Sequence, residues 1–249
     1  RSAISLGAMA HARRAMTKRF YEKVGLETRA GGRAILLDGR AVNTPARRSL
    51  LLPTEALAEA VADEWREQGE EIDPGSMRLT GLANAAIDRI ASDRSDFERD
   101  LAGYGDTDLL YYRAAEPEEL VQRQAARWDP PLEWARRRFD IEFRLQTGVM
   151  PQTQADETLE RLAAALMARD DLTLAAFART VPLSGSLVLM LAVDEGAMTA
   201  DDAWEASILD ELWEEHLWGE DALALASRAA RKADYDAAWR FRLLSRSPA

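Results

Sequence analysis

The segment from Leu187 to Val193 contains seven consecutive apolar residues, and no apolar run in the chain is longer. It is too short to span a bilayer, which requires about 20 residues. Ser184 precedes it as a predicted N-cap, and Gly196 follows it as a helix terminator. A helix that is apolar on every side must be covered on every side by other elements. We therefore predict that this segment is the buried centre of a helical bundle.

Helical spacing of apolar residues dominates from about residue 79 onward. Leu82, Ala86 and Ile90, for example, share one face of a helix. Further helices are predicted over residues 96–101, 118–128 and from 156 onward. These segments would supply the cover that the apolar run needs.

Two segments interrupt this pattern. Pro130-Pro131 is expected to start a separate helix, because proline is tolerated in the first helical turn. Alternating apolar residues over 139–147 are compatible with a strand that returns to an N-terminal sheet.

The first part of the chain has the pattern of short strands. Residues 24–28 alternate, Gly31-Gly32 supplies a turn, and Asp38-Gly39 is a strong hairpin signal. The chain then passes Pro45 and reaches the apolar run 50–52. This order predicts a small antiparallel sheet.

A helix follows, with Thr54 as its N-cap and Trp65 on its apolar face. The predicted fold class is therefore α+β, with a small antiparallel β-containing N-terminal domain followed by a larger α-helical bundle. The expected divisions are a tail over 1–16, an N-terminal domain over 17–92 and a helical domain over 93–249, with the domain boundary open between about 90 and 150.

The N-terminal stretch is rich in arginine and has no acid before Glu22. We expect residues 1–16 to be a disordered tail, either native or left by cloning; an organelle presequence is the alternative. This composition leaves open a bacterial cytoplasmic protein, which we expect, and a mitochondrial matrix protein in a eukaryotic source.

Composition narrows the function classes. The formal net charge of −11 argues against nucleic acid or an anionic membrane as the main ligand, because both require clustered cations. The absence of cysteine excludes disulfides, thiol nucleophiles and cysteine zinc sites. We expect a protein that binds neither nucleic acid nor cofactor, does not insert into a membrane, and is a monomer.

Few residues suit catalysis. The chain has two histidines, so a Ser-His-Asp set would need His216 with Ser184 or Ser186. The sequence around these serines lacks the glycine pattern of a nucleophile elbow, and helix capping explains Ser184 better. No phosphate-binding glycine motif is present. Carboxylates are plentiful, so an enzyme with a carboxylate pair in the interdomain cleft remains the alternative function.

The segment 204–218 combines apolar and acidic residues. On one helix a wide apolar arc would form, with Glu211 at its edge and Glu215 within it. The apolar residues of this arc are Trp204, Ile208, Leu209, Leu212, Trp213 and Leu217. A buried carboxylate needs a partner, because burying it alone is costly. Either an internal arginine pairs Glu211, or the segment docks a partner protein with its acidic rim.

Residues 201–221 (DDAWEASILDELWEEHLWGED) resemble the C-terminal signature of the ATP-twelve family of ATP synthase assembly chaperones. Motifs along the rest of the chain agree in order and spacing, among them 37–40 (LDGR), 52–54 (LPT), 108–113 (DLLYYR) and 148–151 (GVMP). The resemblance covers about residues 19–245. The chain departs from the family pattern at Tyr111 and at Leu212, where an acid is common.

This resemblance implies an N-terminal β-containing domain joined to an orthogonal helical bundle. It also implies binding to the unassembled alpha subunit of the ATP synthase catalytic sector. The family's important acidic residue falls on Glu211. The expected partner-binding residues are Asp210, Glu211, Trp213, Glu215 and Trp218. The expected structural residues are Asp38, Gly39, Pro45 and Trp65.

A third possibility is a constitutive structural subunit. Such a protein would stay in the finished complex at equal stoichiometry, whereas a chaperone would leave it.

Overall fold

The computed structural model describes residues 17–148 and 152–246. The predicted tail over 1–16, with His11, lies outside the described residues, as do positions 149–151 of the last family motif. No helix in the described part is both long and apolar enough to cross a membrane.

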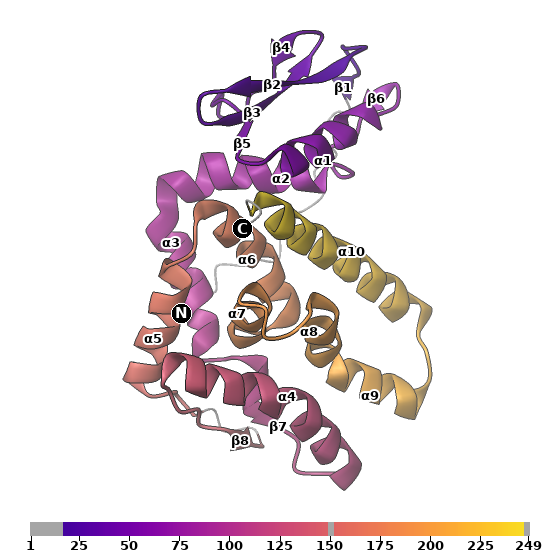
Figure 1. Ribbon diagram of the computed structural model, residues 1–249. Coiled ribbons are helices and arrows are strands. Elements are labelled where there is room, and N and C mark those ends of the chain that lie inside the picture. The colour runs from indigo at the N-terminus through magenta and orange to yellow at the C-terminus, as the bar shows by residue number, and fades with distance from the viewer. Residues whose placement is uncertain (1–16, 149–151, 247–249) are drawn as a thin grey trace, which may run out of the picture.

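The N-terminal part is a small antiparallel sheet covered by one helix (Figure 1). Its strands are β2 (Val24–Arg29), β3 (Gly32–Leu37), β4 (Arg40–Ala41) and β5 (Leu51–Leu52), with β3 pairing all three others. A separate pair joins β1 (Thr17–Lys18) to β6 (Glu71–Ile72). The helix α1 (Glu55–Arg66) contacts β2, β3 and β5. The predicted sheet is therefore confirmed.

The turn between β3 and β4 is the predicted Asp38-Gly39 hairpin. Both residues have positive φ, 48° and 80°, as a primed hairpin turn requires. The Asp38 carboxylate also accepts a hydrogen bond of 2.8 Å from the amide of Lys23, and this bond lowers the pKa of Asp38. The hairpin turn therefore also holds the segment that leads into β2.

Thr54 caps α1 as predicted, with its hydroxyl accepting from the amide of Leu57 at 3.1 Å. The same hydroxyl donates to the carbonyl of Leu244, near the end of the last helix. The start of the first helix is thereby joined to a residue 190 positions later in the chain.

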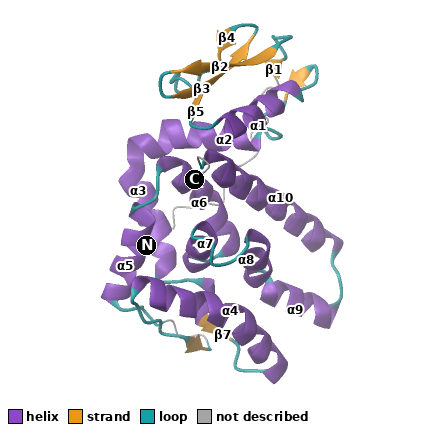
Figure 2. Cartoon of the chain, in the orientation of Figure 1, coloured by secondary structure: helices purple, strands orange, loops and turns teal. Residues whose placement is uncertain are grey.

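The rest of the chain is predominantly helical (Figure 2). Its elements are α2 (Arg78–Ala85), η1 (Ala86–Ile90), α3 (Ala91–Ala102), η2 (Gly103–Gly105), η3 (Leu109–Tyr111), β7 (Tyr112–Arg113), α4 (Glu118–Phe139), β8 (Gln146–Thr147), α5 (Asp156–Met167), α6 (Asp171–Ser184), α7 (Leu187–Asp194), α8 (Ala200–Ser207), α9 (Leu209–Trp218) and α10 (Ala222–Ser245). The apolar helix α7 lies inside this group (Figure 1), and residues 187–192 have no exposed surface. The prediction of a buried central helix is confirmed.

The caps and breaks in this part differ from the prediction at two places. Ser184 is the last residue of α6; Gly185 turns the chain with a φ of 69°, and Ser186 caps α7 through the amide of Leu189. Pro130-Pro131 does not start a new helix, since α4 runs continuously through both residues. The buried stripe of Trp128, Leu132 and Ala135 continues across the prolines, and α4 packs against α7. This packing outweighs the local preference for a helix start.

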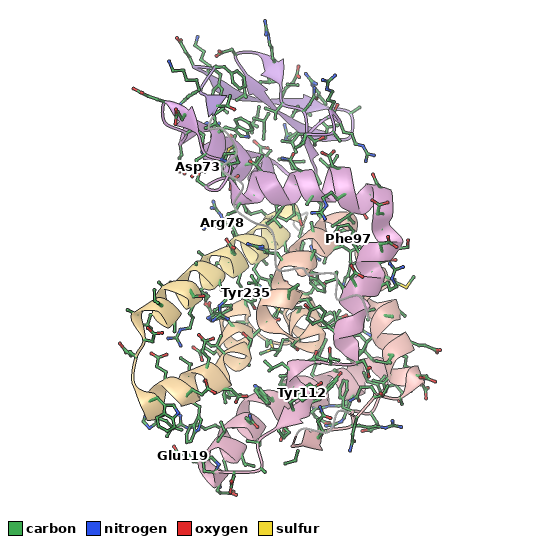
Figure 3. The ribbon with its side chains drawn as sticks, turned by 180° about the vertical axis from the view of Figure 1, so that it is seen from behind. Asp73, Arg78, Phe97, Tyr112, Glu119 and Tyr235 are labelled. Atoms are coloured by element: carbon green, nitrogen blue, oxygen red, sulfur yellow. The ribbon has the colours of Figure 1, made fainter. Side chains whose placement is uncertain are left out.

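The prediction for residues 139–147 was wrong. Phe139 ends α4, and β8 pairs in parallel with β7 instead of returning to the N-terminal sheet. Tyr112 of β7 and Glu119 of α4 lie at the end of the molecule opposite Asp73 of the N-terminal part (Figure 3). The segment that follows α4 therefore lies too far from that sheet to join it.

The main hydrophobic core is shared by both parts of the chain. It extends from Ile35 and Leu50 of the N-terminal part to Phe177 and Trp239 of the helical part. Tyr235 points from α10 into the interior (Figure 3), and its hydroxyl donates to the carbonyl of Ala200 at 3.0 Å. The proposed division between residues 92 and 93 lies within α3 and remains a prediction.

A buried carboxylate lies at the N-terminus of α7. Asp108 is completely buried and accepts hydrogen bonds from the amides of Leu110 at 3.1 Å and Val188 at 3.0 Å. It thus binds one of the free amides of the first helical turn. Burial nevertheless dominates, and it raises the pKa of Asp108 from 3.8 to about 6.

This raised pKa predicts a pH-dependent stability. Between the two pKa values Asp108 is protonated in the native state and ionised in the unfolded state, so its contribution is complete below about pH 4 and is lost as the pH rises through 6. Relative to Asp108→Asn, the wild-type free energy of unfolding should fall by about 2 kcal/mol between roughly pH 4.5 and pH 7. Urea denaturation at both pH values measures this. A difference between the two proteins that does not change with pH would contradict it.

Candidate partner-binding surface

The segment predicted as one amphipathic helix is divided into α8 and α9 by a break at Ile208, whose φ and ψ are −107° and 14°. Trp204, Ile208 and Leu209 remain buried. The break changes the direction of the chain, so Leu212 and Leu217 do not continue the buried arc but are 42% and 53% exposed. The continuous apolar arc predicted from the 100° step was therefore wrong.

Trp213 and Asp210 attach α9 to α4. Trp213 is buried, and the guanidinium of Arg123 lies 5.0 Å from its ring centroid. The Asp210 carboxylate accepts a hydrogen bond of 2.8 Å from the side-chain amide of the buried Gln124. These two of the expected partner-binding residues thus position α9 in the folded chain.

Glu211 and Glu215 attach α9 to α10. Arg231 donates to both carboxylate oxygens of Glu211, at 2.6 and 2.9 Å, and each of these side chains is about one-third exposed. Arg228 pairs with Glu215 and lies 4.0 Å from Glu211. The interpretation that an internal arginine pairs Glu211 is confirmed. Since both acids are held by cations of the same chain, they form a structural ion-pair network.

Exposed apolar side chains concentrate at α9 and the first turn of α10. Four of the nine large apolar side chains exposed in the described residues lie here, and we call them the α9 patch: Leu212, Leu217, Trp218 and Leu223. Trp218 is 86% exposed. The exposed acids Glu214, Glu220 and Asp221 border the patch. The end of α9 and the start of α10 form a projecting corner (Figure 1), and Leu217, Trp218 and Leu223 belong to these two ends. Exposed apolar side chains that lie together mark interaction sites.

The residues expected to be structural lie in the N-terminal part. Trp65 packs edge-on against Tyr21, with ring centroids 5.8 Å apart. The Tyr21 hydroxyl donates a hydrogen bond to the backbone carbonyl of Trp65. Pro45 stands between Thr44 and Ala46, which both donate to the Asp88 carboxylate, at 2.6 and 2.9 Å. Pro45 therefore lies in a loop that is fastened to the helical segment η1.

A serine and the histidine that were considered for catalysis make structural contacts. The described residues contain no group of three or more histidines and carboxylates placed to hold a metal ion. Ser186 is engaged in capping α7, and His216 lies on α9 beside Trp213, with ring centroids 6.1 Å apart. The exposed apolar side chains of the α9 patch are suited to contact with another protein.

Comparison with known proteins identifies the family to which this chain belongs. The family model described as ATP12 chaperone protein matches residues 18–136. The crystal structure of Atp12 from Paracoccus denitrificans is 42% identical, with a TM-score of 0.87 over 92% of this chain and 99% of that chain. The chain belongs to the ATP12 chaperone family.

Other ATP12 relatives agree. A point mutant of P. denitrificans Atp12p is 41% identical with the same TM-score of 0.87, and the match covers 92% of this chain and 98% of that one. The mitochondrial protein atp12 of Schizosaccharomyces pombe is 26% identical over an alignment of 219 residues, and the match covers 82% of this chain and 75% of the relative. The likeness therefore extends through both parts of the ATP12 fold.

The cations that hold α9 were missed in the sequence. Arg228 and Arg231 are three residues apart on α10, and Glu211 and Glu215 are four apart on α9. Each spacing places both charges on one helical face. Matching the two faces would have indicated the contact between these helices. Gln124 gave no comparable signal, because a buried glutamine has no characteristic pattern.

Reversing one charge should loosen α9. Glu211→Arg places a third cation beside Arg228 and Arg231. For a partly exposed pair worth about 1 kcal/mol, hydrogen exchange of the α9 amides should become about fivefold faster. The double variant Glu211→Arg/Arg231→Glu should restore most of the protection.

Hydrogen exchange followed by mass spectrometry measures both effects. Glu214→Arg, on the exposed side of α9, is the matched control and should leave exchange unchanged. If the double variant exchanges as fast as the single one, the pair does not hold α9.

Proposed function

We propose that this protein is an assembly chaperone for the catalytic sector of the ATP synthase, and that it binds the unassembled alpha subunit until beta is available. Membership of the ATP12 chaperone family supports the general role. The α9 patch, with Trp218 86% exposed beside a border of acids, is the observation that carries the proposal.

The physical requirement for such a chaperone is modest. An alpha subunit without beta exposes the surface that it later buries against beta, and exposed apolar surfaces of this kind aggregate. A patch of a few leucines and one tryptophan can cover part of that surface, because single aromatic anchors supply much of the binding energy of an interface. A small interface also allows beta to displace the chaperone. Neither nucleotide hydrolysis nor a cofactor is needed.

Charge supports the choice of partner surface. The acids around the patch and the net charge of −11 favour a client surface that is basic around an apolar centre. The ion pairs that hold α9 have the further role of presenting the patch, so Glu211 acts through the position of the helix. We place the protein, as a monomer, in the bacterial cytoplasm, or in the mitochondrial matrix of a eukaryotic source.

Removing the apolar centre of the patch should weaken chaperone activity strongly. In the variant Leu217→Ser/Trp218→Ser both altered side chains are exposed, so the fold should be retained. Its affinity for the isolated alpha subunit should fall about tenfold or more, because truncated anchors cost the most. Light scattering of the alpha subunit and a pull-down with the purified chaperone measure the loss.

Leu243→Ser is the matched control, since Leu243 is 63% exposed on α10 outside the patch. It should protect the alpha subunit as well as wild type does. Wild-type protein that neither binds the alpha subunit nor keeps it soluble would refute the proposal. Persistence in the finished synthase at equal stoichiometry would identify a permanent subunit instead.

A further inference from the structure

The residues that line a groove come mainly from α4 on one side and from α8 and α9 on the other. In the ribbon views α8 and α9 lie next to the first part of α4 (Figures 1 and 3). The groove consists of two neighbouring hollows, and Ala126 and Arg127 of α4 line both. The outer hollow has a volume of about 310 Å³, and its apolar lining is completed by Leu209, Leu212 and Trp213. The inner hollow has a volume of about 210 Å³, and its lining includes Pro130, Trp134 and Met198.

The spacing of the hollows matches a helix. The α4 residues that line the inner hollow are centred about four positions after those that line the outer one. At 1.5 Å per residue the two centres are about 6 Å apart along α4. Apolar side chains at positions i and i+4 of a docked helix have the same spacing.

The walls select a helix over an extended segment. A strand has unpaired backbone N–H and C=O groups, which need partners when they are buried. The lining residues lie on helices, apart from Ala197 and Met198 in the loop before α8, and backbone groups inside a helix are already paired. A bound helix satisfies its own backbone groups and needs only side-chain contacts from the walls.

The two walls differ in charge. Arg123 and Arg127 stand on the α4 wall, and Asp202 and Glu205 stand on the α8 wall. Arg127 and Glu205 form an ion pair across the groove at 3.1 Å, and these side chains are 51% and 56% exposed. Separating so exposed a pair costs little, so a ligand can displace it. The walls favour a helix with acids along one flank and cations along the other.

We propose that this groove docks an amphipathic helix of a partner protein, with two bulky apolar side chains one turn apart and opposite charges on its flanks. Leu212 belongs both to the groove and to the α9 patch, so the two surfaces are continuous. The inference rests on the function proposed above only in taking the alpha subunit as the source of the helix.

A synthetic peptide tests the groove with the full chain. The probe is a labelled helical peptide of roughly 15 residues, with two leucines four positions apart, lysines on one flank and glutamates on the other. Fluorescence anisotropy should show saturable binding to the wild-type protein. A peptide with serine in place of both leucines should not bind.

Variants locate the site. Ala126 lines both hollows, so Ala126→Trp places an indole where they meet and should lower the affinity for the peptide about tenfold or more. Leu212→Asp, in the outer hollow, should have a similar effect. Ala126 and Leu212 are both exposed, so the fold should be retained. Ala233→Trp, at an exposed position of α10 outside the groove, is the matched control and should bind as wild type does.

Absence of saturable binding, or equal affinity of wild type and Ala126→Trp, would overturn the inference. Because the assay contains no alpha subunit, that failure would leave the proposed client untouched. Conversely, failure of the alpha-subunit assay would leave the groove to be judged by the peptide.

Discussion

The complete burial of α7 is the constraint on which the arrangement of the other helices depends. A helix with apolar residues on every side needs neighbours all around it, and α4, α6 and α8 pack against it. Its N-terminal amides are equally buried, and Asp108 from a distant loop accepts from one of them. The core around α7 is complete without the exposed apolar side chains of α9 and α10. These side chains can therefore face solvent.

Features encoded by a few neighbouring residues could be predicted. The Asp38-Gly39 hairpin and the Thr54 cap follow from local turn and capping chemistry, and the buried run at 187–193 follows from its composition. Features decided by distant contacts could not. The helix α4 continues through two prolines because its buried stripe packs on α7, and residues 139–147 pair with β7 because α4 carries them away from the N-terminal sheet.

The same distinction applies to the candidate surface. Periodicity located the segment and its acids, and it left open whether Glu211 meets an internal arginine or a partner. The arginine lies 20 positions away on another helix, so only the tertiary structure could decide between these possibilities. The break at Ile208 was hidden because apolar residues continue through it. That break separates the buried half of the segment from the exposed half, and it thereby creates the surface.

The contact between Thr54 and Leu244 has a consequence for the order of folding during synthesis. The N-terminal sheet and α1 leave the ribosome long before α10, yet the end of α10 supplies an acceptor for the cap of α1. This joint cannot form until residue 244 has emerged. A nascent chain can therefore assemble its sheet early, but the contact between α1 and α10 forms only when α10 docks against α1, α2 and α6.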